Sequence, residues 1–139
     1  MKRGSANCDA AEVVRAVGNA VVAGDAGNLR PMLMTGRDLA WLQRASEENS
    51  DSAFDERGYV SAAKDVAAWA ALAKGGQVVG VQVGSTLHNH VMEGFARPTD
   101  VIDDSVVLVN RNGQTTRVGI QHLFFIDGCW RIAEIGNPR

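Results

Sequence analysis

The chain contains little proline, tyrosine and cysteine, and it has no long apolar run. Among its 139 residues are three prolines, one tyrosine and two cysteines. No stretch approaches the roughly 18 consecutive apolar residues of a membrane-spanning helix, so we expect no membrane partner. The N-terminus also lacks the apolar segment of a signal peptide, although a leader removed beforehand would leave no trace. On this pattern we expect a cytoplasmic protein.

An excess of charge of one sign is also lacking. Fourteen Lys and Arg residues against sixteen Asp and Glu residues give a formal net charge of -2, and the longest basic run is Lys2 and Arg3. The basic footprint of a protein that binds phosphate backbones is absent, so we expect no nucleic acid partner. With 45% hydrophobic and 22% charged residues, the composition indicates one soluble globular domain over residues 1–139.

The two cysteines, Cys8 and Cys129, stand at opposite ends of the chain. They do not have the C-x-x-C spacing that is typical of zinc sites or thiol chemistry. We therefore expect two reduced thiols. The alternative is a mutual disulfide, which applies if the protein is exported.

Helical periodicity begins near the N-terminus. Asp9 and Glu12 have the spacing at which an N-cap residue and its reciprocal partner satisfy the first-turn amides. Gly24 stands where a C-terminal glycine belongs, so we expect a helix from Asp9 to about Ala23. The apolar face of this helix comprises Val13, Val14, Val17 and Val21.

Two shorter helical segments should follow. Asp25 can cap a short helix to Met34, which Pro31 limits because its ring removes an amide donor. Residues 39–42 continue as a further turn or two.

A change of composition marks residues 46–58. Five acidic side chains and several serines surround Phe54, which predicts a solvated loop. The segment lacks the alternate carboxylates and central glycine of a calcium loop. Ser61 then precedes an alanine-rich helix that should end at the Gly75-Gly76 pair.

Beyond Gly76 the helical period gives way to the alternation typical of β-strands. The pairs Asn112-Gly113 and Asp127-Gly128 are hairpin signals, so three consecutive strands should form an antiparallel meander. No helix-length segment separates these strands, which excludes a parallel sheet. The fold class is therefore α+β, with N-terminal helices packed on a curved antiparallel sheet. The core face of the longest strand should carry Val118, Ile120, His122, Phe124 and Ile126.

Two stretches resemble the nuclear-transport-factor-like superfamily, a cystatin-like cone fold with polyketide-cyclase-like and ketosteroid-isomerase-like members. AVVAGDAGNLRPMLM is similar to the turn between the first two helices of that superfamily, and FFIDGCWRIAEIG is similar to its last hairpin. The resemblance implies a cone-like half-barrel with a pocket between the helices and the concave face of the sheet. It also implies a homodimer formed through the outer face of the sheet.

The superfamily does not imply one activity, because its members include enzymes as well as domains that only bind or scaffold. The chain departs from the isomerase pattern. Its single tyrosine, Tyr59, stands at the end of the acidic segment, and no clear strand-borne aspartate is paired with a tyrosine donor. The helices all precede the sheet, whereas many members insert strands between the second and third helices.

The pair His88 and His90 raises the question of a metal site. On a regular strand the two side chains share one face and lie about 6.5–7 Å apart. Glu93 lies an odd number of positions from His90 and projects to the other face, which leaves His122 as the third ligand. Because zinc needs three or four converging ligands, we expect solvated or polar-core histidines and no metal.

His122 is expected to be buried, since it stands between Ile120 and Phe124 on the core face. A buried imidazole needs a hydrogen-bond partner, which would be a backbone carbonyl or Tyr59. Alternatively, His122 serves a ligand in the pocket. Trp69 is expected in the core or, at a pocket mouth, as an apolar wall for a ligand.

We expect the chain to bind a small, largely apolar molecule, without a cofactor. The candidate contacts are His122, His88, His90, Tyr59 and Trp69. One alternative is an isomerase, dehydratase or cyclase that uses a pocket histidine. A further alternative is a non-catalytic protein-interaction module that uses the outer face of the sheet.

Overall fold

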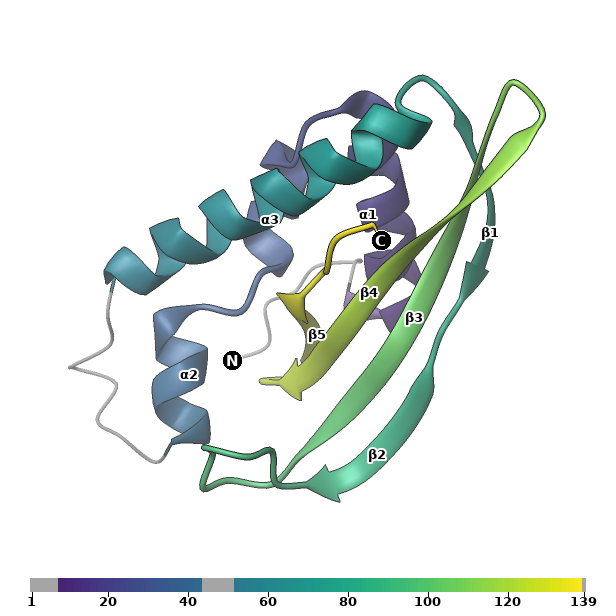
Figure 1. Ribbon diagram of the computed structural model, residues 1–139. Coiled ribbons are helices and arrows are strands. Elements are labelled where there is room, and N and C mark those ends of the chain that lie inside the picture. The colour runs from purple at the N-terminus through teal and green to yellow at the C-terminus, as the bar shows by residue number, and fades with distance from the viewer. Residues whose placement is uncertain (1–7, 44–51, 139) are drawn as a thin grey trace.

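The computed structural model describes residues 8–43 and 52–138, and in these ranges helices precede a five-stranded sheet (Figure 1). This arrangement confirms the predicted α+β class. The helices are α1 (Ala10–Ala23), the 3-10 helix η2 (Gly27–Met32), α2 (Gly36–Leu42) and α3 (Ser52–Ala73). The strands are β1 (Gln77–Gln82), β2 (Ser85–His90), β3 (Thr99–Arg111), β4 (Gln114–Ile126) and β5 (Cys129–Glu134).

The sheet is antiparallel throughout, with strand order β1-β3-β4-β5. Strands β1 and β2 lie end to end along β3, because β1 pairs with Val106–Asn110 and β2 with Thr99–Asp103. The Asn112-Gly113 and Asp127-Gly128 turns join the last three strands, which confirms the predicted meander. Figure 1 shows the long strands β3 and β4 curving past the helices, which cover one side of the sheet.

The main core lies between α1 and the sheet. The four valines predicted for the inner face of α1 are fully buried and pack with strand residues that include Val107 and Val118. Gly18 allows this close packing, because a Cβ at that position would lie 2.6 Å from Val107 Cγ2. A second, smaller cluster under α2 contains Leu42, Val101, Phe124 and Ile126.

The helix caps differ from the prediction. Gly24 ends α1 with φ 69°, as expected, but Asp9 makes no side-chain capping hydrogen bond. The reciprocal capping pair belongs to α2 instead. Thr35 Oγ1 accepts from the Asp38 amide at 3.1 Å, and Asp38 Oδ2 accepts from the Thr35 amide at 2.9 Å. The capping-box spacing is therefore present at the starts of both α1 and α2, but only α2 forms the reciprocal hydrogen bonds.

The acidic segment is only partly what the sequence predicts. Helix α3 begins at Ser52, nine residues before the predicted start at Ser61, so residues 52–58 are helical and the predicted loop is wrong there. Residues 46–51 lie outside the described part of the chain. Polar composition predicts exposure, and residues 53–58 are indeed exposed or half-buried, but exposure does not distinguish a loop from a solvated helix.

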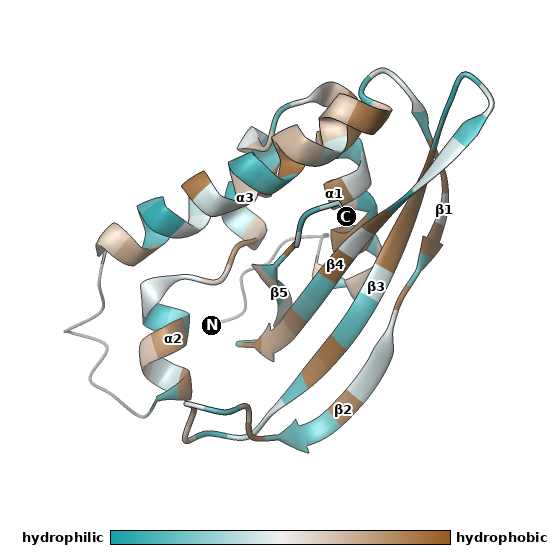
Figure 2. Cartoon of the chain, viewed as in Figure 1, coloured by the Kyte–Doolittle hydropathy of each residue, from teal (hydrophilic) through white to brown (hydrophobic). Residues whose placement is uncertain are grey.

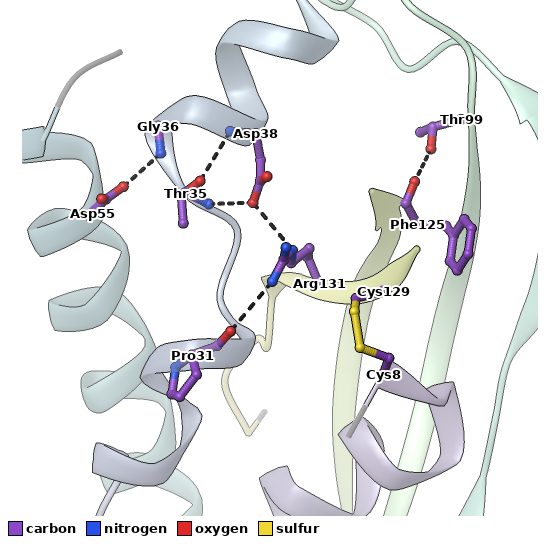
Figure 3. Close-up of polar contacts among 10 residues, drawn as sticks. All are labelled: Cys8, Pro31, Thr35, Gly36, Asp38, Asp55, Thr99, Phe125, Cys129 and Arg131. Atoms are coloured by element: carbon purple, nitrogen blue, oxygen red, sulfur yellow. Dashed lines mark hydrogen bonds and ion pairs between the residues drawn. A yellow bond between two sulfur atoms is a disulfide. The ribbon is translucent and has the colours of Figure 1, made fainter. Parts of the chain in front are cut away.

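Cys8 and Cys129 form a disulfide, so the expectation of two reduced thiols is wrong. The bond joins positions 121 residues apart and ties the segment before α1 to the first residue of β5 (Figure 3). Local spacing carries no information about this pairing, because it depends on how α1 packs against the sheet.

Candidate functional site

A cavity of about 230 Å³ lies between α3 and β5, and we refer to it as the α3–β5 cavity. It lies between a helix and the sheet. Most of its wall is apolar, and four residues contribute charged or hydroxyl groups. The cavity is lined by Leu33, Met34, Phe54, Arg57, Gly58, Ser61, Ala62, Asp65, Ile132, Ala133, Glu134 and Ile135.

Two local features of the sequence leave this space open. The first is Gly58 on α3, where an added Cβ would meet nothing within 4 Å. The second is an irregularity in β5. His122 pairs with Glu134 while Leu123 pairs with Ile132, so Ala133 is an extra residue that bulges out of register. Bulges bend a strand and redirect its side chains, and they are frequent beside binding sites.

Asp65 is the titratable group whose environment in the cavity is most perturbed. Burial raises the pKa of this carboxyl above its ordinary value of 3.8, and the negative charge of Glu134 adds to the rise. The Gly136 amide, which donates to Asp65 Oδ2 at 3.3 Å, and the charge of Lys64 both oppose it. The carboxyl is therefore partly desolvated and close to a like charge.

A polar network lies next to the part of the cavity wall where Met34 leads into α2. Arg131 of β5 is 2% exposed, and its Nε lies 3.5 Å from Asp38 Oδ2, the same oxygen that caps α2 (Figure 3). The Gly36 amide donates to Asp55 Oδ1 of α3 at 2.7 Å. These contacts hold the start of α2 against both β5 and α3, so the wall is structurally constrained.

A smaller cavity of about 140 Å³ lies on the other side of the C-terminal segment. Ile135 lines both cavities, and Gly136, with φ 96°, is held from two sides. Its amide donates to Asp65, and its carbonyl accepts from Trp69 Nε1 at 2.9 Å. The smaller cavity is lined by Trp69, Asp104, Ser105, Val106, Gly119, Ile120, Gln121, Ile135, Gly136 and Asn137.

His122 is less buried than expected. Its side chain is 31% exposed, although Ile120 and Phe124 on either side are buried as predicted. Its Nδ1 lies 2.7 Å from Asp103 Oδ1. The prediction that His122 pairs with a backbone carbonyl or with Tyr59 is therefore wrong. Asp103 is the residue opposite His122 on β3. This pair was recoverable from the sequence, because counting outwards from the Asn112-Gly113 turn places the two residues opposite each other.

His88 and His90 do not have the regular geometry that the sequence suggested. Asn89 between them has φ 50°, and the pairing of β2 with β3 shifts at this point. His88 is 77% exposed and its Nδ1 lies 3.5 Å from Asp100 Oδ2, while His90 is half-buried. Within residues 8–43 and 52–138, no three His, Cys, Asp or Glu side chains are grouped to hold a metal ion.

Tyr59 and Trp69 both lie on α3. Tyr59 is half-buried against the main core, and the guanidinium of Arg30 lies 3.7 Å from its ring centroid. Trp69 is buried in the core, as one reading expected, and also lines the smaller cavity. Of the five candidate contacts, Trp69 lines one of the two cavities described above, and the three histidines and Tyr59 line neither. Their role in binding stays a prediction.

The sequence reasoning missed Asp65 and Glu134. Asp65 lies three residues after Ala62 and four before Trp69, so it falls on the apolar face of an alanine-rich helix. A lone carboxylate on such a face was a usable signal. The sequence gives no such signal for Glu134, because its position beside Asp65 depends on the bulge at Ala133.

Comparisons with protein-family models, with curated proteins and with solved structures find no match for this chain. Among the described helices, none combines the length and the apolar character needed to cross a membrane. The class that the structure supports is an α+β domain with helices packed on an open antiparallel sheet.

Proposed function

We propose that the chain binds a small, mainly apolar molecule in the α3–β5 cavity. The observation that supports this proposal is the cavity itself, with a mainly apolar wall and a few polar groups. Its volume of about 230 Å³ exceeds the ~150 Å³ of an apolar cavity that accepts benzene. It is below the ~300–1,000 Å³ of sites for drug-sized ligands. A single six-membered ring with a short arm matches this size.

The proposal is tested by filling the cavity from Gly58, with toluene as the probe. The residue lines the cavity within α3, and its missing Cβ has open space around it. Replacing Gly58 with leucine should therefore occupy the cavity without a clash at Cβ. Gly58→Ala is the matched control, because it makes the same gain in helix propensity, about 0.5–1 kcal/mol, with little added volume.

Toluene should shift the backbone NMR signals of cavity residues such as Ala62 and Ala133 in the original protein and in Gly58→Ala. In Gly58→Leu these shifts should be lost at the same toluene concentration while the rest of the spectrum stays native. Shifts that persist in Gly58→Leu would reject this cavity as the site.

The enzyme alternative that uses a pocket histidine gains no support from the two cavities, since no histidine lines either. The observation on its side is the His122–Asp103 pair, in which a carboxylate 2.7 Å from Nδ1 orients the imidazole. A substrate site at this pair would require a separate recess. The binding function therefore remains our preferred proposal.

We also propose, from the resemblance to the nuclear-transport-factor-like superfamily, that the chain forms a homodimer through its sheet. Val79 and Phe125 are large apolar strand residues that are 56% and 39% exposed, and Phe125 packs on Trp130 with ring centroids 5.1 Å apart. Burial of such side chains favours association. A sedimentation mass near twice 14.8 kDa at micromolar concentration is the expected result. A mass of 14.8 kDa would contradict it.

The disulfide changes the compartment that we propose. Disulfides persist in oxidising compartments and are rare in the cytosol, where thiols are kept reduced. Since Cys8 and Cys129 are bonded, an oxidising compartment is favoured over the cytoplasm expected from the sequence. Free-thiol titration of protein isolated under conditions that block exchange should detect no reactive cysteine.

A further inference from the structure

The negative charge in the α3–β5 cavity comes from two carboxylates on different elements. Asp65 comes from α3 and Glu134 from the end of β5, and their charges interact. Asp65 Oδ2 accepts from the Gly136 amide at 3.3 Å. Within the described residues, the other oxygen of Asp65 and the side chain of Glu134 have no hydrogen-bond donor or ion-pair partner. Asp65 is half-buried and Glu134 is exposed, so the two negative charges repel each other through a partly solvent-screened interaction.

Among the described residues, no cation forms an ion pair with either carboxylate, although the charge of Lys64 partly offsets that of Asp65. Arg57 also lines the cavity, but it precedes Asp65 by eight residues on α3, which is about 12 Å along the helix axis. Lys64 acts on Asp65 through its charge but does not line the cavity. The carboxylate end of the cavity therefore has a negative potential, next to a wall formed by Ile132 and Ile135.

We propose that the molecule bound in the α3–β5 cavity is an apolar amine whose protonated nitrogen lies between Asp65 and Glu134. This inference rests on the proposed function. An ammonium group offers three donors, which suits the open oxygen of Asp65 and the Glu134 carboxylate together. Its charge removes the repulsion between the two acids. The apolar remainder of the ligand packs against the isoleucines, Met34 and Phe54.

Three probes with the same ring separate this inference from the proposed function. Benzylamine is a cation at pH 7, toluene is neutral, and phenylacetate is an anion. Their dissociation constants are measured by NMR titration at low ionic strength, where charge interactions are least screened. Benzylamine should bind about 10-fold more tightly than toluene, and phenylacetate should bind more weakly than toluene.

Asp65→Asn and Glu134→Gln remove one charge each with little change of shape. Each should weaken benzylamine binding about three- to tenfold while leaving toluene binding unchanged. Glu93→Gln is the matched control, since it removes a carboxylate that does not line the cavity, and benzylamine affinity should stay the same.

Each outcome has a definite meaning. If toluene binds as tightly as benzylamine, or if the two variants bind benzylamine as the original protein does, the amine inference is wrong while the apolar site stands. If phenylacetate binds most tightly, Arg57 and not the acidic pair determines the ligand. If none of the three probes shifts the cavity signals, both the inference and the proposed function are wrong.

Discussion

The two long helices of this protein are used in different ways. More than half of the residues of α1 are buried, including every valine of its inner face. In α3 the first buried residue is Ala62, and residues 53–61 are all exposed or half-buried. The second half of α3 contributes Val66 and Trp69 to the main core. Helix α1 is therefore a core element along its whole length, whereas the first half of α3 serves as a wall of the cavity. Figure 2 shows hydrophilic and hydrophobic residues mixed along α3.

The first half of α3 is attached mainly by polar surface contacts. Arg30 Nη1 lies 2.9 Å from Glu56 Oε1, and its guanidinium covers Tyr59. Asp55 accepts from the Gly36 amide. Exposed ion pairs contribute roughly 0–1 kcal/mol each, far less than the burial of several valines. Stability is therefore concentrated around α1, and the α3 wall of the cavity belongs to the more weakly held segment.

The largest expected effect comes from breaking the disulfide, which belongs to the α1 side of the comparison. A bond that closes a loop of 121 residues should contribute about 3–5 kcal/mol, mainly by restricting the unfolded chain. Reduction with dithiothreitol should lower the melting temperature by about 10–20 °C. Cys8→Ala should melt at the lower temperature with or without the reductant. An unchanged melting temperature on reduction would show that the disulfide is not a stabilising link.

The same substitution at three valines measures the difference between the helices directly. Val17 on α1 and Val66 on the second half of α3 are 0% and 1% exposed, whereas Val60 is 54% exposed. Val→Ala should cost about 2–3 kcal/mol at Val17 and at Val66. At Val60 the change should stay within about 0.5 kcal/mol, because alanine regains in helix propensity what little packing is lost. Urea denaturation gives all three values, and a cost at Val60 equal to that at Val17 would remove the distinction.

The features predicted correctly from the sequence are those that local pattern determines. The valines of α1 follow the helical period, and the Asn-Gly and Asp-Gly turns define the last three strands, so both needed no tertiary information. The start of α3 was missed because a solvated helix and a solvated loop have the same polarity. The His122–Asp103 pair was recoverable from hairpin register, although the prediction did not use it.

The candidate site was less predictable than the fold. The disulfide and the Asp65–Glu134 pair each join segments that are distant in the chain, and no short-range spacing encodes them. The cavity is also lined by Ala133, the residue at the register shift between β4 and β5, and this irregularity is visible only once the two strands are paired. Site geometry is a tertiary property, whereas the class of fold followed from period and turns.

The smallest expected effect is the pH dependence that Asp65 adds to the free energy of unfolding. It tests whether the half-buried carboxylate in the cavity lowers the stability of the folded protein. The folded-state pKa of Asp65 is raised above 3.8, so the folded protein holds this proton to a higher pH than the unfolded chain does. Well below pH 3.8 the carboxyl is protonated in both states and has no effect. As the pH rises past 3.8 and through the folded pKa, the unfolded chain loses the proton before the folded protein does, so Asp65 progressively destabilises the fold. Asp65→Asn carries no charge at any pH. The free energy of unfolding of this variant, minus that of the original protein, should therefore grow from acid to neutral pH and then stay constant.

Two further variants should change, in opposite directions, how much Asp65 destabilises the fold at neutral pH. Burial is the main cause of the raised pKa of Asp65, and Glu134→Gln removes the repulsion that adds to it, so this change should reduce the destabilisation. Lys64→Gln removes an opposing charge and should increase it. Urea unfolding in buffers of stepped pH measures each curve. An asparagine variant that is less stable than the original protein at neutral pH would mean that the carboxylate supports the fold through Gly136. A more stable variant that has also lost its preference for benzylamine would mean that Asp65 is kept for binding at the expense of stability, as functional polar groups often are.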